Sequence, residues 1–169
     1  MGWKFTPLLL ALILATIPVF ANDDWIPSVA WGEPATEVIE NPYLCRGPME
    51  IDENVDVHMC NQVVLGHEAV VTLYFVDGSY ACFSVTMQAR GSSADQIRSE
   101  FDTVVSKLDT AVGRAGGRDG TPRGEPRATW LTESETIRAV VESSGGSPLI
   151  GIVGLAGEHH QRVARLVNW

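Results

Sequence analysis

The clearest pattern of apolar and polar positions lies between Glu68 and Met87. Two runs, EAVVTLYFV and SYACFSVTM, are rich in β-branched and aromatic residues and lie on either side of Asp77-Gly78. Strands favour such residues, and an Asp-Gly pair suits a type I′ turn because both central residues of that turn need positive φ. The pattern predicts a β-hairpin, and Val63-Val64-Leu65 predicts a third strand before it. Both hairpin faces are partly apolar, so the sequence leaves open which face is buried.

A helical pattern follows the hairpin. Ser93, with Gln96 three residues later, forms a capping-box sequence, and Gly113 suits the left-handed position after a helix. Between them one apolar stripe repeats at helical spacing: Ile97, Phe101, Val104, Val105, Leu108 and Val112. We therefore expect a long amphipathic helix that packs on one face of the hairpin sheet.

The remaining segments are shorter. Pro34 to Glu40 predicts a short helix, whereas Tyr43 to Cys60, with Gly47-Pro48 and several acids, predicts a loop with at most one short strand. Three later strands and a terminal helix are predicted at 128–132, 136–141, 149–155 and 158–167. The expected fold class is α+β: an antiparallel sheet of about five or six strands, one long amphipathic helix on one face, and short flanking helices.

The start of the chain has the features of an export signal. Lys4 precedes an apolar stretch from Pro7 to Phe20, and Val19-Phe20-Ala21 has the small-residue pattern of a cleavage site. The stretch is shorter than the ~20 apolar residues of a spanning helix. We expect residues 1–21 to be a cleaved signal peptide and 22–169 to form one domain in the periplasm or outside the cell, without stable membrane insertion.

Charge is distributed unevenly along the expected mature chain. Residues 22–113 contain 4 basic and 15 acidic residues, whereas residues 114–169 contain 7 basic and 6 acidic ones. An acidic body of this kind argues against nucleic acid or an anionic membrane as the main partner.

Three cysteines indicate one disulfide and one free thiol in an oxidising compartment. Cys45 and Cys60 both lie in irregular segments, whereas Cys82 lies inside a strand pattern and is expected to be buried. The preferred pairing is Cys45 with Cys60, and the alternative is Cys60 with Cys82.

A glycine-rich segment, 114–127, is predicted to be a mobile loop. It carries four arginines, which form a candidate site for an anion or a partner: Arg114, Arg118, Arg123 and Arg127. The alternative is an insertion whose charges stay solvated or lie against the protein's own acids.

Other chemistry finds little support in the sequence. Asp52-x-Asn54-x-Asp56 imitates the start of a calcium loop, but Val57 stands where that loop needs glycine. The histidines at 58, 67, 159 and 160 lack zinc-type spacing. We therefore expect no metal and no cofactor, and assign no catalytic residue.

Several motifs together resemble small exported bacterial domains of unknown function. They are Trp31-Gly32 near the expected mature start, the Phe75-Val76-Asp77-Gly78 hairpin, and a T-x-W-type strand in which Trp130 lies between Thr129 and Leu131. The resemblance covers roughly residues 29–142, and it implies no functional residues.

The sequence favours a binding module whose partner is a protein or a cell-envelope component. The expected contact surface is an open sheet face or the edge of the hairpin, with Tyr74 and Trp130 as candidate contact residues. The tryptophans have the alternative role of filling the core. Two other functions remain open, a hydrolase with carboxylates in a cleft near the arginine loop and an inhibitor acting through that loop. The oligomeric state is left open.

Overall fold

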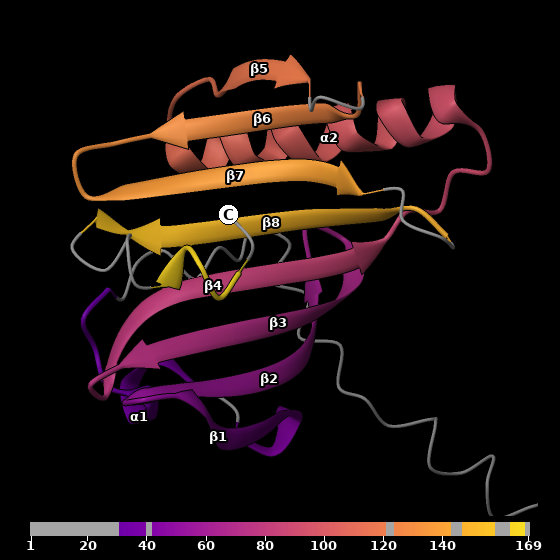
Figure 1. Ribbon diagram of the computed structural model, residues 1–169. Helices are drawn as coiled ribbons and strands as arrows, with labels where there is room; N and C mark the ends of the chain where they lie inside the picture. The colour runs from indigo at the N-terminus through magenta and orange to yellow at the C-terminus, as the bar shows by residue number, and fades with distance from the viewer. Residues whose placement is uncertain (1–30, 40–41, 121–123, 143–146, 158–162, 168–169) are drawn as a thin grey trace, which may run out of the picture.

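A single antiparallel sheet of eight strands dominates the structure, a computed structural model that describes residues 31–39, 42–120, 124–142, 147–157 and 163–167. The strands are β1 (Cys45–Asp52), β2 (Val55–Val64), β3 (His67–Val76), β4 (Ser79–Gln88), β5 (Gly117–Gly120), β6 (Pro126–Leu131), β7 (Glu135–Glu142) and β8 (Leu149–Ala156). Helical elements are α1 (Ala35–Val38), the 3-10 turn η3 (Pro42–Leu44) and α2 (Ala94–Val112). The order across the sheet is β1-β2-β3-β4-β8-β7-β6-β5, so two four-strand meanders join where β4 pairs with β8 (Figure 1).

The predicted fold class is wrong. The chain is mostly sheet, with eight strands instead of five or six, and α2 is the one helix of seven or more residues in the described part. Strand β1 and residues 55–60 of β2 lie in the segment predicted as a loop, and β5 lies inside the arginine loop. Strands β1 and β5 form the two edges of the sheet, and nearly all of their residues are exposed. Such strands lack the alternation of buried and exposed residues by which strands are recognised in a sequence.

The hairpin and the helix follow the predicted local signals. β3 and β4 pair antiparallel around Asp77 and Gly78, whose φ angles of 52° and 80° are those that a type I′ turn requires. Helix α2 begins at a capping box between Ser93 and Gln96 and ends at Gly113, which is left-handed with φ of 74°. These two predictions are confirmed.

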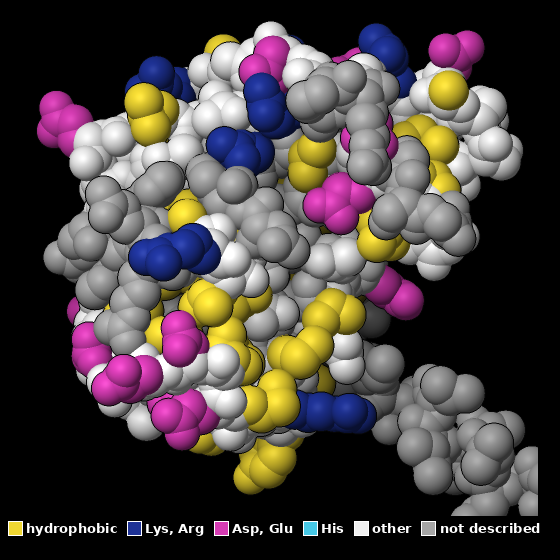
Figure 2. Space-filling model, in the orientation of Figure 1, with side chains coloured by type: hydrophobic (Ala, Val, Ile, Leu, Met, Phe, Trp, Pro, Cys, Tyr) yellow, Lys and Arg dark blue, Asp and Glu magenta, His cyan; other side chains and the backbone are white. Residues whose placement is uncertain are grey.

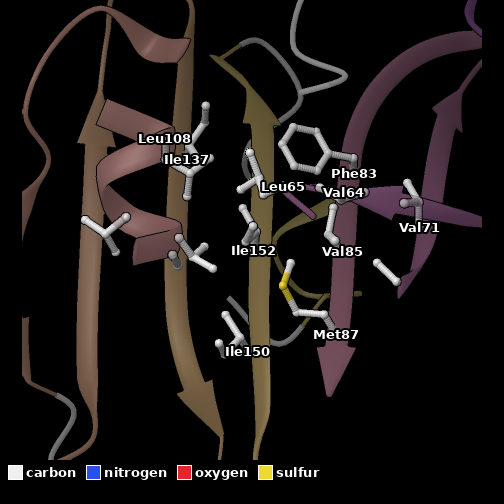
Figure 3. Close-up of a cluster of buried hydrophobic side chains, with 14 of the residues drawn as sticks. Val64, Leu65, Val71, Phe83, Val85, Met87, Leu108, Ile137, Ile150 and Ile152 are labelled. Carbon is white, nitrogen blue, oxygen red and sulfur yellow. The ribbon is translucent and has the colours of Figure 1, made fainter. Parts of the chain in front are cut away.

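The main core lies between the sheet and its helices. In Figure 1, α2 runs behind β6 and β7, and its buried stripe is Phe101, Val104, Val105 and Leu108. Figure 3 shows this core, in which Leu108 of α2 meets Ile137 of β7, with Ile152 on the neighbouring strand β8. Segment α1 packs against the same core through Ala35 and Val38. We call this side of the sheet the helix face and the opposite side the open face.

The described C-terminal residues lie on the open face. Val163 is buried there with Val55, Val76 and Leu155, which belong to a second, smaller apolar cluster. Residues 158–162, half of the predicted terminal helix 158–167, lie outside the described residues, as does the predicted signal peptide, 1–21.

Candidate functional site

Exposed apolar side chains gather on the strands at one edge of the sheet. Met49 and Ile51 of β1 are 41% and 47% exposed, Met59 of β2 is 41% exposed, and Val70 of β3 is 38% exposed. We call these four residues the β1–β3 patch. Figure 2, which views the open face, shows hydrophobic side chains gathered over this part of the sheet. These strands therefore present apolar surface to solvent.

The strand register makes most of the patch continuous. Met49 lies opposite Val57, which is two residues before Met59 on the same face of β2. Met59 in turn lies opposite Thr72, which is two residues after Val70 on β3. Diagonal neighbours on one face of an antiparallel pair lie about 7–8 Å apart, within reach of long side chains. Met49, Met59 and Val70 therefore form one row across three strands.

The strands that carry the patch are acidic. Residues 42–89 contain six acidic residues and a single basic one, Arg46, which lies opposite Met59. On the face that carries Met49, Asp52 of β1 lies opposite Val55, and Glu68 stands two residues before Val70 on the same face of β3; both acids are exposed. Acidic side chains also line one margin of this part of the surface in Figure 2. The patch is thus an apolar row with an acid at each end, and Arg46 lies beside Met59 in its middle.

The hairpin edge is not available as a contact surface. The outer edge of β3 pairs with β2 along ten residues, from Val55 opposite Val76 to Val64 opposite His67. The outer edge of β4 pairs with β8. Of the two predicted contact surfaces, the hairpin edge is therefore wrong, and the open face is the one that carries exposed apolar residues.

The two predicted contact residues lie on opposite faces. Tyr74 is half-buried on the open face, where it packs against the smaller apolar cluster. Burial raises the pKa of Tyr74, although a hydrogen bond with Ser84 opposes the shift. Trp130 is 1% exposed beneath α2, and its Nε1 donates to Asp109 Oδ1 at 2.8 Å. Trp130 therefore fills the core and contributes nothing to an exposed partner surface.

The arginines of the predicted anion site bind the protein's own oxygens. Arg114 Nη1 donates to the Leu131 carbonyl at 2.6 Å, and Arg127 Nε donates to Asp119 at 2.7 Å. Arg118 forms ion pairs with Asp102 and Asp109 of α2 at 3.3 and 3.2 Å, and Arg123 lies outside the described residues. The described guanidiniums do not converge on one place, and part of the loop predicted as mobile is strand β5.

Two acids beside these arginines, Asp109 and Asp119, have lowered pKa values. Partial burial raises the pKa of Asp109, but hydrogen bonds from Gly116 N, Trp130 Nε1 and Arg118 outweigh it, so the pKa is lowered overall. A hydrogen bond from Arg127 lowers the pKa of Asp119. A general acid needs a raised pKa, so neither carboxylate suits that role in a hydrolase.

The predicted disulfide between Cys45 and Cys60 is confirmed. The two residues lie directly opposite each other and fasten the edge strand β1 to β2. Cys82 is free and buried, and burial raises the pKa of its thiol well above the usual value. A protonated, buried thiol is a poor nucleophile, so Cys82 is a packing residue.

No metal site forms from the described residues. Within those ranges, no three His, Cys, Asp or Glu side chains are grouped so that they could hold a metal ion. His67 is 9% exposed and its Nδ1 lies 3.3 Å from Glu100 Oε1. Burial and the charge of Arg90 lower the pKa of His67 despite this carboxylate. The helices of the same ranges include none that is long and apolar enough to cross a membrane.

One cluster that the sequence did not predict joins the first described residues to the sheet. Trp31 stacks on Tyr80 with ring centroids 4.9 Å apart, and its Nε1 donates to Glu135 Oε2 at 2.8 Å. Gly32 N also donates to the Tyr80 carbonyl at 2.8 Å. Burial raises the pKa of Glu135, although the hydrogen bond from Trp31 opposes the shift. The cluster fastens the segment before α1 to β4 and β7.

Most of the patch was also missed, although the sequence holds a signal for part of it. Val55, Val57 and Met59 alternate with polar residues and share one face of β2. This alternation indicates a strand that begins earlier than the predicted third strand, which was placed at Val63-Val64-Leu65. Met49 and Ile51 alternate in the same way on β1, but too briefly to indicate a strand by themselves.

Comparison of the chain with models of protein families, with curated proteins and with solved structures finds no match. The resemblance to small exported bacterial domains draws no support from these comparisons, and any proposal about function depends on the geometry of the chain itself.

Proposed function

We propose that the protein is a non-catalytic binding module that contacts its partner through the β1–β3 patch. The observation that carries the proposal is the continuous row of exposed apolar side chains formed by Met49, Met59 and Val70. Contiguous apolar surface rimmed by polar residues is typical of interaction sites, because water contact with it is lost when a partner docks. Methionine suits such a surface, since its unbranched side chain adapts to the shape of a partner.

The partner docks on the face of these strands rather than on an edge of the sheet. Strand β1 forms one edge, but Pro48 has no N–H to donate, and two register shifts interrupt its pairing with β2. Strand β5 forms the other edge, spans only Gly117–Gly120 and carries the charged residues Arg118 and Asp119. Short, charged or proline-bearing edges resist the addition of another strand.

The proposed setting is the periplasm or the exterior of the cell, and the proposed partner is a protein or a component of the cell envelope. The leader pattern in residues 1–21 supports export. The disulfide between Cys45 and Cys60 is compatible with an oxidising compartment, where such bonds persist.

Capture with matched variants tests the proposal. The double variant Met59→Thr/Val70→Thr removes two of the four apolar side chains of the patch while keeping strand-forming residues. The control Leu131→Thr changes another exposed apolar residue, 63% exposed on β6, at the far side of the sheet. Each bait is first shown to be folded by circular dichroism, then exposed to the extracytoplasmic fraction, and retained proteins are quantified by mass spectrometry.

Support requires a protein that wild type and Leu131→Thr retain equally and the double variant retains at a much lower level. Equal retention by all three baits counts against the proposal, as does a wild-type bait that retains nothing.

A further inference from the structure

Resting on the proposed function, we infer that the segment bound by the β1–β3 patch is cationic: an apolar stretch of a partner protein flanked by lysine or arginine. The inference concerns the chemistry around the patch, whereas the proposed function concerns only the patch itself.

The acids border the apolar row at more than one place. Glu68 lies on the open face two residues beyond Val70, and Asp52 lies on the same face opposite Val55, beyond Met49 at the other end of the row. The β1–β2 turn adds the exposed residue Glu53. A ligand that lays apolar side chains on the row therefore brings its flanking residues beside carboxylates.

The opposing charge is small. Arg46 is the single basic residue among residues 42–89, against six acids. Charges within about 10 Å interact without full screening at 0.1 M salt, so this imbalance acts on anything docked at the patch. Complementary charge steers association and rejects ligands of like charge.

The same imbalance disfavours two other occupants. A second copy docked patch to patch brings two acidic borders together, and like charges in contact oppose association. An anionic lipid surface attracts basic segments and repels an acidic one. Both occupants are outcomes that the experiment below detects.

Binding of two matched peptides tests the inference. One probe is a short apolar peptide with lysines at both ends, and the other carries glutamates in their place. Fluorescence anisotropy measures their affinity for the full chain and for the variant Asp52→Asn/Glu68→Gln. The control variant is Glu133→Gln/Glu142→Gln, which removes two exposed acids from the opposite half of the sheet.

We expect wild type to bind the lysine peptide about tenfold more tightly than the glutamate peptide, since several exposed charge pairs act together. The Asp52→Asn/Glu68→Gln variant is expected to weaken lysine-peptide binding about threefold or more, and added salt is expected to do the same. The control variant is expected to bind the lysine peptide as wild type does.

The outcomes separate the inference from the proposed function. If Met59→Thr/Val70→Thr weakens both peptides while wild type binds them equally, the cationic preference is overturned and the patch remains the contact surface. If that variant binds the lysine peptide as well as wild type does, the patch itself fails, and the inference fails with it. Absence of binding by either peptide, patch-dependent dimers in analytical ultracentrifugation, or a preference for anionic vesicles over the lysine peptide also overturns the inference.

Discussion

Two glycines on β8, Gly154 and Gly151, predict opposite responses to alanine because they lie on opposite faces of the sheet. A Cβ at Gly154 falls 2.2 Å from Cε1 and 2.5 Å from Cζ of Phe83, on the helix face. Carbon atoms in contact normally lie about 3.5–4.0 Å apart, so the ring must move. Phe83 is 1% exposed and stacks with Trp31 at 6.0 Å, so it has no free space to enter.

The magnitudes follow from packing and from the unfolded chain. Overpacking of a core costs about 1–3 kcal/mol, and replacing glycine by alanine returns about 0.4–1 kcal/mol by restricting the unfolded state. Gly154→Ala is therefore expected to lower the free energy of unfolding by about 1–2 kcal/mol. A Cβ at Gly151 has Val140 Cγ1 as its nearest atom, at 3.7 Å, which is an ordinary contact. Gly151→Ala is therefore expected to raise the free energy of unfolding by up to about 1 kcal/mol.

Urea unfolding followed by tryptophan fluorescence, with the disulfide intact, measures both variants against wild type. An unchanged slope of free energy against urea shows that the denatured state is comparable. The reasoning fails if Gly154→Ala is as stable as wild type, or if Gly151→Ala is the more destabilised of the two, because Phe83 would then not lie against the backbone of β8.

Three further predictions concern the disulfide and two carboxylates. The variant Cys45→Ala/Cys60→Ala, which opens a loop with a sequence separation of 15, is expected to lose about 3 kcal/mol of stability in urea unfolding, and reduced wild type is expected to match it. Asp109→Asn weakens the hydrogen bond that Asp109 accepts from Trp130 Nε1, and it is expected to lower the free energy of unfolding by about 1–2 kcal/mol at neutral pH. The pKa of Asp109 is lowered in the folded state, so the ionised carboxylate stabilises the fold at pH values above the unfolded pKa. The stability lost in Asp109→Asn is therefore expected to be full in that range and to shrink as the pH falls through the folded pKa. A loss of stability that does not change with pH would contradict the argument. The pKa of Glu135 is raised in the folded state, so ionisation of this carboxyl destabilises the fold as the pH rises above 4.5, its ordinary pKa. The stability of Glu135→Gln relative to wild type, measured by thermal melts, is therefore expected to increase from mildly acidic to neutral pH. A relative stability that decreases over this range would refute the prediction.

The elements that could be predicted depend on neighbouring residues. Helix α2 begins where Ser93 and Gln96 satisfy each other's backbone groups, three positions apart, and it ends where Gly113 takes positive φ. The turn at Asp77 and Gly78 is equally local. The disulfide was predicted because Cys45 and Cys60 were placed in irregular segments; the pairing is confirmed, although both residues lie in paired strands.

The candidate site could be predicted only in part. Tyr74 was placed in the hairpin correctly, but the side of the sheet it occupies depends on where α2 and the C-terminal residues pack. Trp130 looked like a candidate surface residue because nothing near it in the sequence shows that α2 covers it and that Asp109 accepts its N–H. Met49 escaped notice because β1 is an exposed edge strand without a buried face.

By itself, the sequence determined the Asp77-Gly78 turn, the capped helix and the acidic character of the β1–β4 half, because these follow from composition and from contacts between residues near one another in the chain. It favoured the pairing of Cys45 with Cys60 but left the pairing of Cys60 with Cys82 open. The tertiary structure alone decided that β4 pairs with β8, that β1 and β5 form the edges of the sheet, and which face of the hairpin remains exposed. Pairing between distant strands is chosen by the burial of whole faces, and no single segment carries that information.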